Sequence, residues 1–117
     1  RFRGGASITA KDYLNAREAM YKLRRDFAAA TAGYDGILLP TIPIVPPTVQ
    51  ALLDDAAYFT RTNLLALRNT RVINLMGGCA ITLPLKQPGC GLMVAAGAGQ
   101  DRRLLRVAAG IEAALAR

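Results

Sequence analysis

Three short apolar runs, each bounded by proline or glycine, set the narrowest limits on how this chain can fold. They cover residues 37–39, 79–83 and 91–96. Runs of this length between turn-forming residues are typical of β-strands, and the first is typical of a strand that is buried on both faces. The proline and glycine residues between the second and third runs predict an antiparallel hairpin, in which residues 80–84 pair with residues 91–96.

A long helix is predicted before the first of these runs. Thr9 and Asp12 resemble a capping box, in which a hydroxyl and a carboxylate three residues later satisfy free backbone N–H groups. Apolar side chains then recur at spacings of three and four, which predicts one stripe that packs into the core. Gly33 supplies the expected stop, because glycine readily takes the left-handed conformation after a last helical turn. The stripe consists of Tyr13, Ala16, Met20, Leu23 and Phe27.

Further helices are predicted on both sides of the hairpin. One stretch runs from about residue 55 to residue 67, residues 68–70 are expected to break it, and another turn follows before Gly77. Asp101 is expected to cap a last helix. Strands and helices together predict an α/β fold, with a few buried strands of a mixed sheet packed by helices, in one domain over residues 1–117. The apolar face of the last helix comprises Leu104, Leu105, Ala108, Ile111 and Leu115.

The composition limits which classes of protein and which kinds of partner are possible. Hydrophobic residues make up 52% of the chain, which for so short a sequence indicates surface that a larger fold or a partner subunit covers. The net charge is +7, yet the basic residues are scattered and only 6% of residues are aromatic, as on solvated helix faces. No apolar run is long enough to span a bilayer. We therefore expect neither nucleic acid nor a membrane as a partner, and we expect self-association.

Residues that most often carry catalysis are scarce. The sequence has no histidine, which excludes Ser-His-Asp and Cys-His catalysis within it, and it offers no metal cluster of the usual His/Cys type. Ser7 is the one serine, and no activating base stands at a recognisable spacing from it. Gly97-Ala98-Gly99 lacks the third glycine of a dinucleotide-binding loop, so a tight strand-to-helix turn is the better interpretation. We expect no metal and no cofactor.

The two cysteines are expected to remain reduced. In the predicted hairpin Cys90 lies at the turn and Cys79 at the open end, whereas the Cα atoms of a disulfide lie within roughly 7 Å of each other. Cys79 is then a small buried hydrophobic residue. Free cysteines indicate a reducing compartment, and we expect the protein in the cytoplasm.

Four segments follow one another in a recognisable order, and together they resemble the C-terminal part of the amidase-signature family. The first reads Tyr-Asp-Gly-Ile-Leu-Leu-Pro-Thr-Ile-Pro, similar to the family's strand followed by Pro-Thr-x-Pro. The second ends in Asn-Leu-Met-Gly-Gly-Cys-Ala-Ile-Thr-Leu-Pro, although the family often has proline in place of Cys79. The loop before Gly91 is short and lacks the usual Gly-Leu-Pro. The segments cover residues 34–43, 67–70 with 74–84, 91–94, and 100–105 with 111–112.

The resemblance implies a hydrolase that cleaves carboxamides through an acyl-enzyme. Family members use a serine nucleophile, a second serine in a cis peptide and a lysine, all N-terminal to this stretch. A chain with one serine cannot supply that triad, so we expect a framework and part of the pocket for a small-molecule amide substrate, inactive in isolation. The alternatives are a stand-alone interaction or oligomerisation module and a small basic nucleic-acid binder.

The resemblance also implies where this chain meets the substrate. Thr41 directly follows the proline that ends the first strand, at a position that lies near the substrate in the family. Leu64, Leu67 and Arg71 match a pocket-facing helix face, and their spacings of three and four place them on one side. Arg68 is a second candidate to meet a polar or anionic group. The alternative is that both leucines belong to the core and that Arg68 is a solvated or structural residue.

Overall fold

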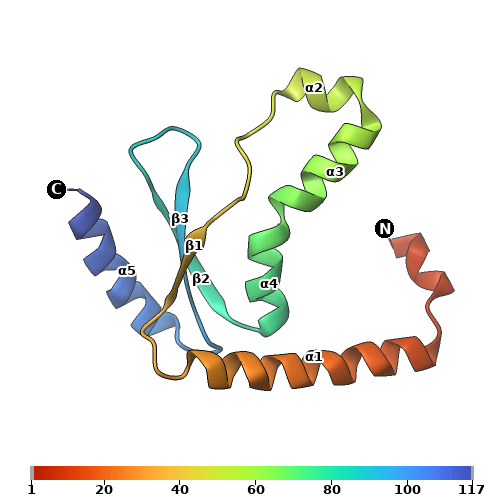
Figure 1. Ribbon diagram of the computed structural model, residues 1–117, viewed down its shortest axis with the longest axis horizontal. Helices are drawn as coiled ribbons and strands as arrows, with labels where there is room; N and C mark the ends of the chain where they lie inside the picture. The colour runs from red at the N-terminus through yellow and green to blue at the C-terminus, as the bar shows by residue number, and fades with distance from the viewer. Residues whose placement is uncertain (1, 117) are drawn as a thin grey trace.

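The computed structural model describes residues 2–116, and Figure 1 shows their arrangement. Helices and strands occur together, as the α/β prediction requires. The elements in chain order are the 3₁₀ helix η1 (Phe2–Ser7), α1 (Ala10–Thr31), β1 (Ile37–Pro40), α2 (Val49–Asp54), α3 (Ala56–Ala66), α4 (Arg68–Met76), β2 (Cys79–Pro84), β3 (Gly91–Ala96) and α5 (Asp101–Leu115).

The sheet has the strand order β1-β3-β2. The predicted hairpin is confirmed, since Ala80 lies opposite Ala95 and Pro84 lies opposite Gly91. β1 pairs antiparallel with the other side of β3. The mixed sheet that we predicted is therefore wrong for residues 2–116, where both pairings are antiparallel.

β3 lies at the centre of a three-layer arrangement. Its side chains alternate between the two faces of the sheet, as a strand's geometry requires. Val94 and Ala96 pack with Leu104 and Ala108 of α5 on one face. Figure 1 shows α4 on the opposite side of the sheet from α5. The second core there consists of Ile73, Met93 and Ala95, with Phe27, Ile37 and Leu39 packed against it.

Burial differs from prediction at two places. β1 is not buried on both faces, because Leu38 is 56% exposed. The stripe of α1 is not a core face within this chain either, since Tyr13 is 56% exposed and Leu23 is 54% exposed. Only Met20 and Phe27 of the stripe are half-buried. The reason is that α1 runs along one end of the sheet and extends past it (Figure 1).

The start of α1 was predicted correctly and its end was not. Asp12 N–H donates to Thr9 Oγ1 at 3.2 Å, and Thr9 Oγ1 donates to Asp12 Oδ2 at 2.6 Å. The helix ends at Thr31, and the next residue, Ala32, stays right-handed with a φ of −59°. Gly33 therefore does not provide a left-handed stop. The predicted stop at Gly77 is confirmed by its φ of 74°.

The breaks between the middle helices fall elsewhere than predicted. Residues 68–70 form the first turn of α4, and the break is Leu67 alone, with a φ of −83° and a ψ of −1°. α2 was not predicted, although Thr48 caps it by accepting a hydrogen bond from Ala51 N–H at 3.2 Å. Before α5, Gln100 takes the capping position that we assigned to Asp101, without a side-chain bond. Leu105 is 57% exposed and does not share the buried face of α5.

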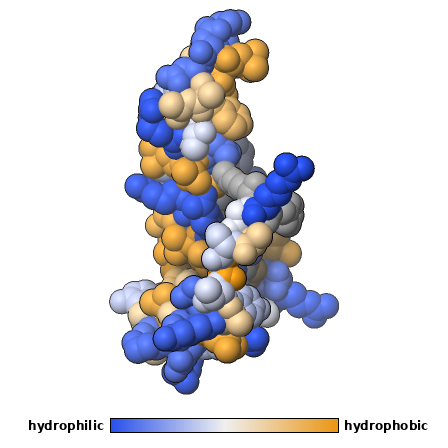
Figure 2. Space-filling view, turned by 90° about the vertical axis from the view of Figure 1, so that its right-hand side faces the viewer, coloured by the Kyte–Doolittle hydropathy of each residue, from blue (hydrophilic) through white to orange (hydrophobic). Residues whose placement is uncertain are grey.

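The described residues form an open body. Its radius of gyration is 17.3 Å, whereas a compact chain of this length has one of about 13 Å. The arm formed by α2 and α3 leads away from the sheet (Figure 1), and apolar side chains reach the surface between charged ones over much of the face drawn in Figure 2. Within residues 2–116, no helix combines the length and apolarity needed to cross a membrane.

Candidate functional site

Thr41 lies where β1 ends, beside the start of β3. Its N–H donates to the Gly91 carbonyl at 2.9 Å, which extends the pairing of β1 and β3 by one residue. Its hydroxyl donates to Thr82 Oγ1 of β2 at 3.1 Å. The Thr41 side chain thus reaches across the central strand and joins the two outer strands of the sheet.

Gly91 makes this contact possible. A Cβ at this position would lie 2.7 Å from Thr82 Cγ2 and 2.9 Å from Thr41 Oγ1, closer than such atoms approach in folded proteins. Any other residue here would push the two hydroxyls apart. Thr41 is half-buried and Thr82 is exposed, so the pair remains open to a ligand.

Asn69 connects this pair to helix α4. Its side-chain amide donates to the carbonyl of Pro40 at 2.7 Å, one residue before Thr41. Arg68 Nε in turn donates to Asn69 Oδ1 at 3.4 Å, a long hydrogen bond. Two of the predicted residues, Thr41 and Arg68, are therefore linked through a third that was not predicted.

The other predicted residues lie at the junction of α3 and α4. Arg71 Nη2 donates to the Leu64 carbonyl at 3.5 Å, so these two residues share one side of the junction, as their spacing predicted. Leu67 is the residue at the break, and its carbonyl accepts from Arg71 N–H at 3.0 Å. Leu64 is 45% exposed and Leu67 is 41% exposed, which does not fit the alternative that they are core residues within this chain.

A shallow hollow of about 360 Å³ opens over the hydroxyl pair. A larger, mainly apolar cleft of about 570 Å³ adjoins it and shares Ile42, Gly89, Cys90 and Gly91 with it. Neither space is lined by the other four predicted site residues, which are Leu64, Leu67, Arg68 and Arg71. The residues that line the hollow are Thr41, Ile42, Thr82, Pro84, Gly89, Cys90 and Gly91.

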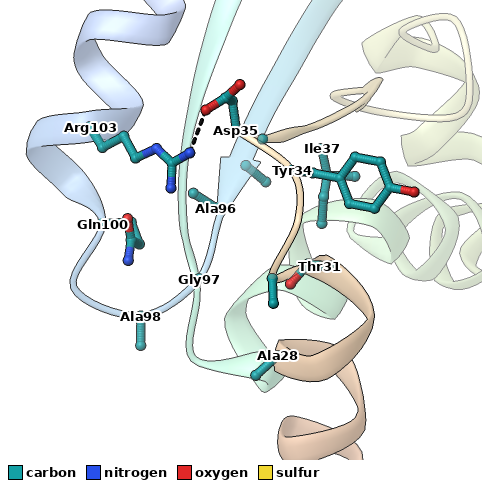
Figure 3. Close-up of a pocket in the computed structure, with 13 residues that line it drawn as sticks. Ala28, Thr31, Tyr34, Asp35, Ile37, Ala96, Gly97, Ala98, Gln100 and Arg103 are labelled. Carbon is teal, nitrogen blue, oxygen red and sulfur yellow. Dashed lines mark hydrogen bonds and ion pairs between the residues drawn. The ribbon is translucent and has the colours of Figure 1, made fainter.

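A separate cleft of about 310 Å³ lies at the other end of β3, and Figure 3 shows its lining. Arg103 of α5 forms an ion pair with Asp35 at its side, and the two side chains are 46% and 78% exposed. Small residues such as Ala28 and Gly97 form much of the remaining wall. None of the predicted site residues lies in this cleft.

The residues that line the hollow include no carboxylic acid and no basic side chain. Backbone N–H groups of Tyr58 and Ala57 hold the pKa of Asp55 below its ordinary value, but this carboxylate caps α3. Within residues 2–116, no three His, Cys, Asp or Glu side chains come together as metal ligands would. The hollow offers hydrogen bonds to a ligand, and its lining residues include no nucleophile beside an activating base.

Asn69 and Thr82 are the two neighbours of the site that sequence reasoning missed. Both occur in the segments that resemble the amidase-signature family, but neither has a periodic or motif position that singles it out. Thr82 meets Thr41 only because Gly91 lies between them, and the contact joins residues 41 positions apart. A glycine at the first position of the predicted strand over residues 91–96 was the one available signal.

Comparisons with known proteins identify the family. The sequence profile of the family described as Amidase matches residues 2–105. The 2-amino-5-chloromuconic acid deaminase of Comamonas testosteroni is 29% identical over 117 aligned residues, which cover 97% of this chain and 25% of that protein. No solved structure gives a significant match. The match over residues 2–105 shows that the chain belongs to the amidase family.

Proposed function

We propose that this chain is the C-terminal segment of an amidase-family hydrolase that cleaves carboxamide C–N bonds, with residues 1–117 as framework and pocket wall. The chain spans 25% of the length of its Comamonas testosteroni relative, which supports a longer parent protein. That relative is named as a deaminase of an acid, so it too acts at a C–N bond. The substrate of the parent is a small-molecule amide.

We assign this chain a non-catalytic role mainly because its sequence has so few serines. Ser7 is the one serine in the sequence, and its hydroxyl donates to the Gly4 carbonyl at 2.9 Å within the short helix η1. A nucleophilic serine needs a base that accepts its proton, and the chain has no histidine. In the family that the sequence resembles, the serines and the lysine precede this segment, so the acyl-enzyme forms on residues outside it.

The open shape supports the same assignment. Leu38 on strand β1 and Leu64 on α3 are exposed, and β1 and β2 each have a neighbour on one side only within residues 2–116. Exposed apolar area and free strand edges favour contact with further polypeptide. The same observation also favours the second candidate, a stand-alone interaction module that binds a partner through these faces.

An activity assay on two proteins tests the proposal. The 117-residue chain and the complete protein encoded by its reading frame are assayed against aliphatic and aryl amides, with ammonia or amine release as the readout. We expect turnover by the complete protein and none by the chain. Turnover by the chain that is lost on Ser7→Ala would refute the non-catalytic role. A complete protein without activity towards any amide would favour the interaction module.

A further inference from the structure

We propose that the outer edge of β2 is an interaction surface, and that a β-strand from the rest of the complete protein pairs with it. This inference rests on the part of the proposed function that assigns a longer parent protein, and it names the edge at which the sheet continues. Within residues 2–116, the strand order β1-β3-β2 leaves one outer edge on β1 and one on β2. The register of the strands shows which backbone groups face each edge.

The outer edge of β2 is open to a further strand. In an antiparallel pair, the backbone N–H and C=O of successive residues point alternately towards the partner strand and away from it. Leu85 N–H donates to the Cys90 carbonyl at 3.2 Å, so the odd-numbered residues of β2 face β3. Ala80, Thr82 and Pro84 face outwards, and in the described part of the chain no hydrogen bond reaches their backbone groups. Because proline lacks an N–H, these groups are two donors and three carbonyl acceptors.

The outer edge of β1 is largely closed. Thr41 N–H donates to the Gly91 carbonyl at 2.9 Å, so the odd-numbered residues of β1 face β3, and Leu38 and Pro40 face outwards. Pro40 has no N–H to offer, and its carbonyl already accepts the 2.7 Å hydrogen bond from Asn69. The N–H and the carbonyl of Leu38 are the groups that remain, which is too few to hold a paired strand.

This difference indicates where the sheet ends and where it continues. Proteins protect the true edges of their sheets with proline, charged side chains or cover, because free edge groups attract other strands. β1 is protected in this way, whereas β2 has no charged residue and has proline only at its last position. The open edge over residues 80–84 matches a strand of typical length, about five residues. The chain spans 25% of the length of its Comamonas testosteroni relative, so the longer parent has the polypeptide to supply that strand.

The added strand would also complete the surroundings of the hollow. Neighbouring strands lie about 4.8 Å apart, so the strand would lie directly beside Thr82, which lines the hollow of about 360 Å³. On the other face of β2, Ile81 packs against the core beneath α5. The partner strand should therefore carry an apolar side chain next to Ile81, and its opposite face would form a further wall of the hollow.

Amide hydrogen exchange of the complete protein, resolved to single residues, tests the proposal. The amides of Ala80 and Thr82 should exchange at least about a hundredfold more slowly than the amide of Leu38, each relative to its intrinsic rate. Leu38 is the internal control, because its N–H also faces outwards from the same sheet. Fast exchange at Ala80 and Thr82, or slow exchange at Leu38, would overturn the assignment of the edge.

Two proline variants of the complete protein provide a matched comparison. Ala80→Pro and Leu38→Pro each remove an outward N–H and no hydrogen bond to β3. Ala80→Pro should lower the thermal midpoint by about 3 °C more than Leu38→Pro, because it alone breaks a bond to the added strand. An equal loss in the two variants would contradict the proposal. Should neither variant fold, the exchange rates of the wild-type protein decide.

The outcomes also separate other occupants and the proposed function. Protection of Ala80 and Thr82 that disappears on dilution would assign the edge to a second copy and overturn the proposal. Hydrogen exchange reports pairing and not catalysis. A complete protein that cleaves no amide but protects these two amides would overturn the amidase function and support the edge assignment. A reading frame that encodes no further polypeptide would overturn both.

Discussion

The side-chain amide of Asn69 donates a 2.7 Å hydrogen bond to the carbonyl of Pro40, and this bond ties the first turn of α4 to the end of β1. Thr41, the next residue, lines the hollow. A substitution of Asn69 that removes this hydrogen bond should therefore affect both the stability of the chain and the position of the Thr41 hydroxyl.

Asn69→Ala is expected to destabilise the chain by about 1 kcal/mol, the net contribution of one such hydrogen bond. Urea unfolding followed by circular dichroism measures the difference. Asn15→Ala on α1 makes the same change in helix propensity at an exposed position and serves as the reference. Equal stability of the two variants would show that the bond to Pro40 contributes nothing in solution.

Asp55 should make stability depend on pH in the acid range. Backbone N–H groups at the start of α3 lower the pKa of its carboxyl in the folded state. A lowered folded pKa means that the stabilisation is present above the unfolded pKa and is lost as the pH falls through the folded pKa. Asp55→Asn keeps a capping oxygen but does not titrate. The wild-type chain should lose more unfolding free energy than this variant between pH 5 and acid pH, roughly pH 2 to 3.

Both cysteines should remain reduced and should differ in reactivity. Cys90 is an exposed free cysteine, whereas Cys79 is partly buried and its Sγ lies 3.4 Å from the Gly97 carbonyl oxygen. Alkylation of the native chain should modify Cys90 first, and denaturation should expose the second thiol. Intact mass follows both additions. A protein that takes up two alkyl groups only after treatment with a reducing agent would contradict the prediction.

The isolated chain should self-associate weakly. Reburial of a few hundred Å² of apolar surface contributes several kcal/mol at about 25 cal/mol per Å², and the cost of association is of similar size. Sedimentation velocity over a wide concentration range, with ANS fluorescence in parallel, measures the effect. Leu38→Lys places a charge on the exposed edge strand β1 and should weaken association, whereas Leu105→Lys on α5 serves as the comparison. A strictly monomeric chain that binds no dye would contradict this expectation.

Local signals in the sequence predicted the local structure well. Thr9 caps α1 through the backbone N–H of Asp12, Gly77 ends α4 in a left-handed conformation, and β2 and β3 pair as an antiparallel hairpin. Each of these features depends on a few neighbouring residues. α2 escaped prediction because a helix of 6 residues is too short to show periodicity, even though Thr48 caps it.

Burial and the site were harder to predict, because both depend on distant residues. The spacing of Tyr13 and Leu23 predicts an apolar stripe correctly, but it does not indicate whether this chain supplies the cover. The family resemblance placed Thr41 beside a strand end. It did not indicate Thr82 or Asn69, whose contacts with the Thr41 region come from other elements and depend on the folded arrangement.

The alternation of β3 has a consequence for how its length can evolve. Val94 and Ala95 are adjacent, yet they belong to different cores on opposite faces of the sheet. Insertion or deletion of a single residue within β3 would exchange the two sets, and Leu92 could then replace Gly91 beneath the hydroxyls. Within the β2–β3 hairpin, a change in length leaves the strand faces as they are only in the loop at residues 85–90. Among natural relatives, selection should therefore confine the hairpin's insertions and deletions to that loop and conserve the length of the strand.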